Sequence, residues 1–147
     1  MMEAFKMVDI LRRVRHDFGN HLQVINGYLE LGWSEEAKNY IDKVIEYMTY
    51  EKMLFASLEP ESALYFYHQM LSIRDLGVIL RYKDIKVDNL ELIIKADEPY
   101  ASIAAVCRKE GLEGDLFFEA SFYQETDGVK MVLNRDTGEE VVRMIKG

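Results

Sequence analysis

The fold of the N-terminal part of the chain is decided by the stretch Arg15-His16-Asp17-Phe18-Gly19-Asn20-His21-Leu22-Gln23. Apolar residues recur around it at intervals of three and four, which is the periodicity of an amphipathic helix. They are Met7, Leu11, Val14, Phe18, Leu22, Ile25 and Leu29. At about 100° per residue, His16 lies roughly 160° around this helix from Phe18. The histidine is therefore predicted on the polar side of the helix, away from a buried apolar stripe.

The neighbours of His16 suit phosphoryl transfer. A neutral imidazole can attack an activated phosphoryl group through one ring nitrogen. Asp17 can accept a hydrogen bond from the other ring nitrogen, and Asn20 lies one turn later, where its amide can orient phosphoryl oxygens. Arg13 and Gln23 share the same outer face. A lone surface histidine usually has no chemical role, and Asp17 is also a candidate salt-bridge partner for Arg13. The hypothesis therefore depends on the whole group of residues.

The run from Arg15 to Leu31 resembles the phosphoacceptor helix of the sporulation initiation phosphotransferase B family. It is also similar to the helical domain of sensor kinases for dicarboxylates. The shared pattern is Arg-His-Asp, an asparagine four residues after the histidine, Leu-Gln, an apolar pair and a nearby glycine. Gly19 departs from it, because the family usually has a bulkier residue there. The resemblance implies that His16 is phosphorylated and that two helical hairpins pair into a four-helix bundle in a homodimer.

The same resemblance implies a phosphotransferase of a two-component phosphorelay in sporulation signalling. Response-regulator receiver domains would be its partners, and phospho-His16 would carry the phosphoryl group between their aspartates. The residues expected to act in transfer are His16, Asp17 and Asn20, and those expected to contact the receiver are Arg13, Arg15, Gly19 and Gln23. We expect the chain to hold no cofactor or metal of its own, and the receiver to bring Mg²⁺ and a lysine.

The composition argues against several other classes of protein. The 147 residues carry a net charge of −8 and no face rich in Lys and Arg, so nucleic acid is not an expected partner. No apolar run is long enough to span a membrane and the N-terminus lacks the pattern of a signal peptide, so we expect a cytoplasmic protein. Cys107 is the only cysteine, which excludes a disulfide framework. His21 lies about 140° around the helix from His16, too far for a metal pair, and is expected at the edge of the dimer interface.

Residues 1–58 are predicted to form a helical hairpin that serves in dimerisation and histidine phosphotransfer. The first helix should run from Glu3 to Leu31 and end at Gly32, and Ser34 is the expected N-cap of the second. Each helix has an apolar stripe too broad for one partner helix to cover. Pairing with a second copy would bury the remainder.

Residues 59–147 are predicted to form a small domain, so that the whole chain is α+β. Pro60 suits the start of a helix that reaches about Leu76, and a further helix should run from Pro99 to near Gly111. The expected strands are 78–82, 90–96, 115–124, 129–134 and 141–145, with turns at Asp127-Gly128 and at 136–138.

This second domain resembles a reduced, degenerate form of the ATP-binding α/β sandwich of histidine kinases. The helix expected over 100–111 lacks the asparagine that holds magnesium in that family, and Asp136-Thr137-Gly138 is explained by a turn between strands. We therefore expect no autokinase activity. Two alternatives remain open at the level of sequence: a soluble sensor histidine kinase with a minimal nucleotide site, and a non-enzymatic dimeric module that binds a partner protein.

Overall fold

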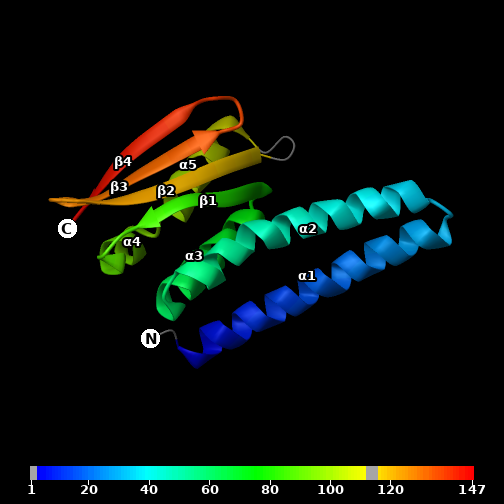
Figure 1. Ribbon diagram of the computed structural model, residues 1–147. Helices are drawn as coiled ribbons and strands as arrows, with labels where there is room; N and C mark the ends of the chain where they lie inside the picture. The colour runs from blue at the N-terminus through cyan, green and yellow to red at the C-terminus, as the bar shows by residue number, and fades with distance from the viewer. Residues whose placement is uncertain (1–2, 112–115) are drawn as a thin grey trace. The chain divides into compact units, whose positions relative to one another are not determined.

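The computed structural model describes residues 3–111 and 116–147 (Figure 1). The architecture is α+β, which confirms the fold class predicted from the sequence: a helical hairpin is followed by a four-stranded mixed sheet with its own helices. The chain divides into two compact units, Met1–Glu61 and Ser62–Gly147. Within the described residues, no helix has the length and apolar character needed to cross a membrane.

The first unit is the predicted hairpin of two long helices, α1 (Ala4–Glu30) and α2 (Ser34–Ser57). α1 ends where Gly32 adopts a positive φ of 76°, which lets the N–H of Trp33 bond back to the carbonyl of Tyr28 at 2.8 Å. The predicted N-cap at Ser34 is wrong by one residue. Trp33 occupies the N-cap without a side-chain capping bond, and its ring instead lies 6.2 Å from that of Tyr28.

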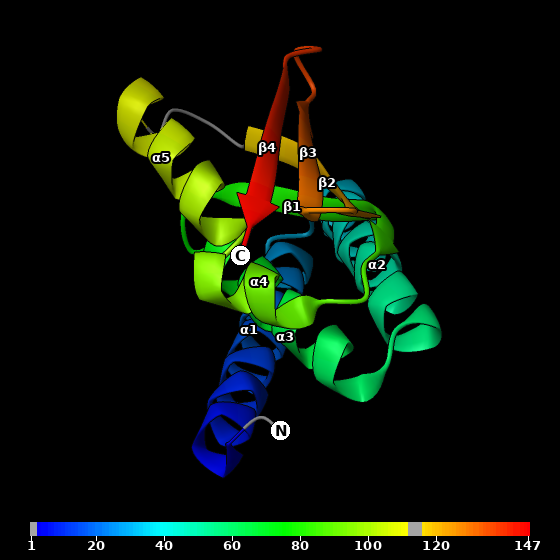
Figure 2. The same ribbon diagram turned by 90° about the vertical axis from the view of Figure 1, so that its left-hand side faces the viewer.

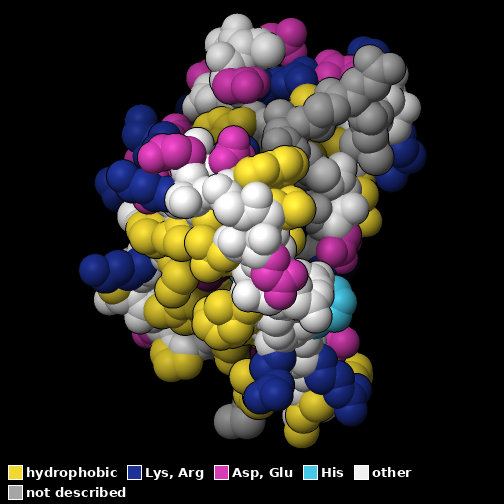
Figure 3. Space-filling model, turned by 90° about the vertical axis from the view of Figure 1, so that its right-hand side faces the viewer, with side chains coloured by type: hydrophobic (Ala, Val, Ile, Leu, Met, Phe, Trp, Pro, Cys, Tyr) yellow, Lys and Arg dark blue, Asp and Glu magenta, His cyan; other side chains and the backbone are white. Residues whose placement is uncertain are grey.

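The apolar stripe of α1, predicted to be buried, lies largely exposed in the single chain. The side chains of Leu11 and Phe18 are 62% and 58% exposed. Other large hydrophobic residues of the hairpin that remain exposed are Phe5, Val8, Val14, Leu22, Val24, Leu29, Leu31, Trp33, Ile41, Ile45, Met48 and Phe55. Figure 3 shows a broad patch of hydrophobic side chains on one side of the chain. The hairpin buries Ile10, Ala37 and Leu54 but leaves much of its apolar surface exposed.

The second unit orders its four strands β1-β2-β3-β4, with β1 parallel to β2 and the other neighbours antiparallel. Its elements are α3 (Pro60–Arg74), β1 (Val78–Lys86), α4 (Leu90–Ala96), α5 (Tyr100–Glu110), β2 (Leu116–Glu125), β3 (Gly128–Arg135) and β4 (Glu140–Lys146). Alternate residues of these strands point to one face, which α3, α4 and α5 cover (Figure 2). There Phe66 of α3 packs its ring against those of Tyr82 and Phe122.

One predicted strand is wrong: residues 90–96 form the helix α4. Short apolar runs do not distinguish a strand from a buried helix by their pattern alone. Here a side chain from β2 favours the helical alternative, because the Oε1 atom of Gln124 accepts hydrogen bonds from the backbone N–H groups of Asp88 and Asn89, just before α4. Ile93 then becomes fully buried while Ile94 stays exposed.

Two other boundaries differ from the predicted ones. β1 continues past Tyr82 to Lys86, because its pairing with β2 resumes after a register shift. The tight turn between β2 and β3 is Thr126-Asp127 rather than Asp127-Gly128, and Gly128 already pairs with Lys146 of β4. A Cβ atom at Gly128 would overlap the backbone oxygen of Ile145, so the close approach of two strands requires glycine there. The predicted start of β2 at residue 115 lies outside the described residues.

Candidate functional site

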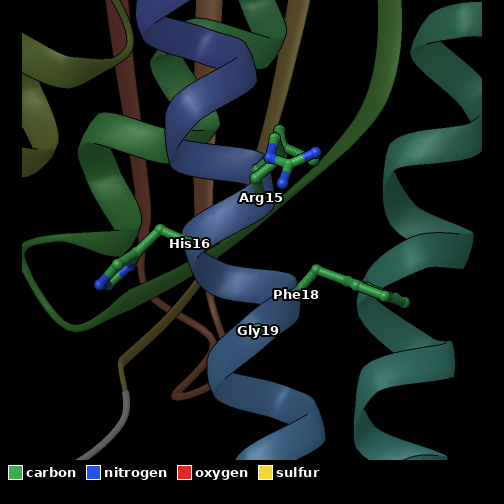
Figure 4. A pocket seen from close by; sticks show the side chains of 5 residues that line it. Arg15, His16, Phe18 and Gly19 are labelled. Carbon is green, nitrogen blue, oxygen red and sulfur yellow. The ribbon is translucent and has the colours of Figure 1, made fainter.

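His16 lies in the middle of α1 and projects into solvent, with 73% of its side chain exposed. Figure 4 shows its imidazole and the ring of Phe18 on opposite sides of α1, with Phe18 on the side of α2. This placement follows from the helical periodicity that puts the apolar residues on one stripe. A shallow depression on this part of α1 is lined by Val14, Arg15, His16, Phe18 and Gly19.

Two polar side chains meet the same ring nitrogen of His16. The Nδ1 atom lies 3.5 Å from the Oδ1 atom of Asp17 and 3.5 Å from the Nδ2 atom of Asn20. A protonated Nδ1 can donate to Asp17, whereas an unprotonated Nδ1 can accept from Asn20, so the two contacts favour opposite neutral tautomers. Neither contact uses Nε2. That nitrogen is left for an incoming electrophile.

Both contacts are at the long limit for a hydrogen bond. Asp17 and Asn20 therefore hold the imidazole loosely in the free protein, and the side chain of Asp17 is itself one-third exposed. Catalytic hydrogen bonds are often long before the reacting complex forms. The arrangement is consistent with a nucleophile whose tautomer is selected once a partner covers the site and excludes water.

The residues predicted to contact a receiver surround this group unevenly. Arg13 is half-buried and takes part in an interaction within the chain, and Gln23 is exposed. Gly19 faces open space, since an added Cβ atom would meet nothing within 4 Å. Arg15 is exposed but points away from the imidazole of His16 (Figure 4). The structure thus brings Asp17 and Asn20 to His16, and it directs Arg15 to a neighbouring face.

The sequence interpretation missed a polar contact inside the hairpin. The Nδ1 atom of His21 lies 2.7 Å from the phenol oxygen of Tyr40, and this hydrogen bond joins α1 to α2. Burial, followed by the charges of Tyr47 and Tyr28, raises the pKa of Tyr40. Only the register of one helix against the other brings these residues together, and the sequence of a single helix carries no signal for it.

Three features of the second unit bear on whether it could hold a nucleotide or a metal. Among the described residues, no three His, Cys, Asp or Glu side chains cluster as a metal site. Helix α5 contains no asparagine. Residues 136–138 form the turn between β3 and β4, in which Gly138 has a φ of 90°. These three residues thus have a structural role that requires no phosphate.

A buried carboxylate stabilises the start of α5. Glu98 is fully buried, and its oxygens accept hydrogen bonds from the backbone N–H of Ser102 at 2.8 Å and from its hydroxyl at 2.6 Å. Arg143 of β4 forms a salt bridge with the same carboxylate. The negative charge also lies at the positive end of the helix dipole. This network connects β4 to the start of α5, and its role is structural.

Comparison with known protein families gives a match for the helical hairpin. Residues 1–57, which span α1 and α2, match the family model described as the sensor kinase SpoOB-type, alpha-helical domain. No curated protein matches the chain. The matched segment contains His16 and all the residues around it, and it leaves out the second unit.

Proposed function

We propose that the chain is a histidine phosphotransferase of a phosphorelay, because residues 1–57 match the SpoOB-type family of sensor-kinase helical domains, which points to two-component signalling. The observation that carries the proposal is the exposed imidazole of His16, whose Nδ1 lies beside Asp17 and Asn20 while Nε2 is left open. The partners are receiver domains of response regulators, and the family points to sporulation as the pathway.

The proposed transfer is an in-line displacement. The Nε2 atom of His16 attacks the phosphorus of a receiver's aspartyl phosphate, the bond from phosphorus to the aspartate oxygen breaks, and the carboxylate leaves with the electron pair. Nδ1 keeps its proton and donates a hydrogen bond to the carboxylate of Asp17, which stabilises the positive charge that the ring gains. Transfer to a second receiver is the reverse reaction. This chain supplies the nucleophile and its alignment, and a receiver that brings Mg²⁺ and a lysine would balance the phosphoryl charge.

The exposed apolar stripe supports a homodimer. Monomers rarely leave so many neighbouring hydrophobic side chains in water, and two hairpins that pair their stripes would bury them in a four-helix bundle. His16 lies on the opposite side of α1 from Phe18, so pairing through this stripe leaves the imidazole accessible to a receiver.

The proposal assigns no autokinase activity to the chain. The second unit has no asparagine on α5, and its Asp136-Thr137-Gly138 segment is a strand-connecting turn. A minimal sensor kinase would bind an ATP analogue, which would raise the melting temperature of the protein. Absence of such a shift, together with transfer from a receiver, distinguishes the phosphotransferase from the kinase.

The direct test is phosphotransfer from a chemically phosphorylated receiver domain to wild-type protein and to His16→Gln. We expect an acid-labile, base-stable phosphoryl label on the wild type and none on His16→Gln. His68→Gln is the matched control, because it removes a histidine from the second unit and should retain the label. A folded, dimeric protein that takes no label from any receiver of the host would refute the proposal and leave a partner-binding module.

A further inference from the structure

The arginines before His16 differ in their relation to the imidazole. Arg12, Arg13 and Arg15 precede it within little more than one turn of α1. At about 100° per residue, Arg12 lies roughly 40° and Arg13 roughly 60° around the helix from His16, whereas Arg15 lies roughly 100° away. Figure 4 shows the side chain of Arg15 directed away from the imidazole. Only Arg12 and Arg13 therefore share the face of the proposed phosphoacceptor.

Of these two, Arg12 is the one without an assigned partner in the fold. Arg13 already has an interaction within the chain. Arg12 is exposed and makes no hydrogen bond or ion pair with any residue in the ranges 3–111 and 116–147. Asp9 lies three residues earlier on the same face, at a spacing where an ion pair is feasible, yet none forms between the two side chains.

We propose that Arg12 binds the phosphoryl group carried by His16, reaching it from one helical turn before the imidazole. Cβ atoms at this spacing are about 6 Å apart, well within the length of an arginine side chain. The planar guanidinium offers paired donors that match phosphoryl oxygens. Asn20 flanks the imidazole from one turn after it, so the phosphoryl group lies between a cation and an amide.

The negative charges near His16 explain why a cation such as Arg12 would stabilise the phosphoryl group. The chain has a net charge of −8, and Asp17 places a carboxylate 3.5 Å from Nδ1 of the same imidazole. A phosphoryl dianion on Nε2 would therefore be formed beside a negative neighbour. A cation on the same face offsets that repulsion and favours the dianion over the monoanion. The inference rests on the proposed function, because it concerns the phosphoryl group that His16 would carry.

Phosphoramidate separates this inference from the relay itself, because it phosphorylates histidine without a receiver. Nε2 forms the new bond to phosphorus, the bond from phosphorus to nitrogen of the reagent breaks, and ammonia leaves. The His16→Gln protein identifies which phosphorus NMR resonance belongs to phospho-His16, and the other resonances belong to other histidines. The pH titration of that resonance reports the ionisation of the phosphoryl group.

We expect Arg12→Gln to raise the pKa of the phosphoryl group by about 0.3 to 0.7 units at low salt, the size typical of one exposed charge pair. Arg12→Lys should restore most of the wild-type value, and added salt should reduce the difference between wild type and Arg12→Gln. Lys6→Gln is the matched control. It removes the same charge from the same helix about 15 Å from His16, so its shift should be clearly smaller than that of Arg12→Gln at low salt and should vanish at physiological salt, where the screening length is about 8 Å.

A titration of Arg12→Gln that coincides with the wild type would overturn the inference, and so would an equal shift in Lys6→Gln. Failure of phosphoramidate to label His16 in folded protein would also overturn it, since Arg12 would then have no phosphoryl group to bind. Labelled protein that shows the Arg12 effect but exchanges with no receiver would refute the proposed relay and leave the assignment of Arg12 intact.

Discussion

The phenol oxygen of Tyr40 lies 2.7 Å from the Nδ1 atom of His21, and this hydrogen bond is a polar link between α1 and α2. Tyr40→Phe keeps the ring and removes the link. We expect it to lower the free energy of unfolding by about 1 kcal/mol, the net contribution of a typical hydrogen bond, as measured by urea denaturation.

The matched control is Tyr50→Phe. Tyr50 bonds to Glu46 of its own helix at an exposed position, so its loss should cost less than about 0.5 kcal/mol. Equal destabilisation by both substitutions would show that the Tyr40 contact does not contribute to the hairpin.

The half-buried phenol of Tyr65 should make the stability of the second unit fall at alkaline pH. The hydroxyl of Tyr65 donates to the carbonyls of Glu98 at 2.8 Å and Ile93 at 3.2 Å. Burial, with the charges of Asp97 and Glu98, raises the pKa of Tyr65 well above its ordinary value. The fold thus favours the neutral phenol. Its contribution is complete below the unfolded-state pKa of about 10 and is lost as the pH rises toward the higher folded-state pKa.

Tyr65→Phe should therefore cost about 1 to 2 kcal/mol at pH 7, where two acceptors lose their donor. The difference from wild type should shrink between about pH 10 and pH 11. Denaturant titrations at several pH values measure it. A difference that stays constant over this range would contradict the raised pKa.

The salt bridge between Arg143 and the buried Glu98 should stabilise the fold more than a typical surface salt bridge does, although Arg143 is partly exposed. Arg143→Met leaves a fully buried carboxylate with only Ser102 as its partner, which should cost about 2 to 4 kcal/mol. Arg81→Met breaks the pair of Arg81 with Glu119, whose carboxylate is not fully buried, and should cost less than about 1 kcal/mol. Thermal unfolding of both variants checks the order, and an equal cost would contradict it.

Gly19 tests how closely a receiver approaches α1. Gly19→Ala should stabilise the helix by up to about 1 kcal/mol, since its Cβ atom would meet nothing in the chain. We expect phosphotransfer from the receiver to slow by about tenfold, which corresponds to a barrier about 1.4 kcal/mol higher. Gly27→Ala, also open and two turns farther along, should stabilise the helix without slowing transfer. Full transfer activity in Gly19→Ala would exclude a close approach of the receiver at Gly19.

The exposed stripe predicts which substitution would disrupt the proposed dimer. Phe18→Asp places a charge on the stripe, and we expect light scattering to show one chain per particle instead of two. Gln23→Asp adds the same charge on the outer face of α1 and should leave the dimer intact. A wild-type protein that is monomeric at all concentrations would contradict the four-helix bundle.

Sequence alone predicted the elements that are long or that end in a distinctive residue. The hairpin was predictable because the apolar period persists over α1 and α2 and because Gly32 marks the turn between them. The proximity of Asn20 to His16 was predictable for the same reason, since side chains four residues apart lie on the same face of a helix. Asp17 lies near His16 because it is the next residue in the chain.

Contacts that depend on tertiary structure were not predictable. Residues 90–96 carry enough apolar and branched side chains for a strand, and the contacts that accompany the helix there, such as those of Gln124 and Tyr65, come from residues distant in sequence. The bond between His21 and Tyr40 depends on the register of two helices, which no local pattern specifies. The role proposed for Arg12 was not predictable from sequence, because it depends on which neighbouring arginines already have an interaction within the chain.

The competition of Asp17 and Asn20 for one nitrogen has a kinetic consequence. Under the proposed function, only the tautomer with a bare Nε2 reacts, so the rate of transfer is the product of that tautomer's population and its intrinsic reactivity. A change of about 1.4 kcal/mol in the balance between the two contacts would alter the population ratio tenfold. Substitutions that shift the equilibrium between the two tautomers of His16 could therefore change the rate of the proposed transfer without altering the chemistry of the reacting groups.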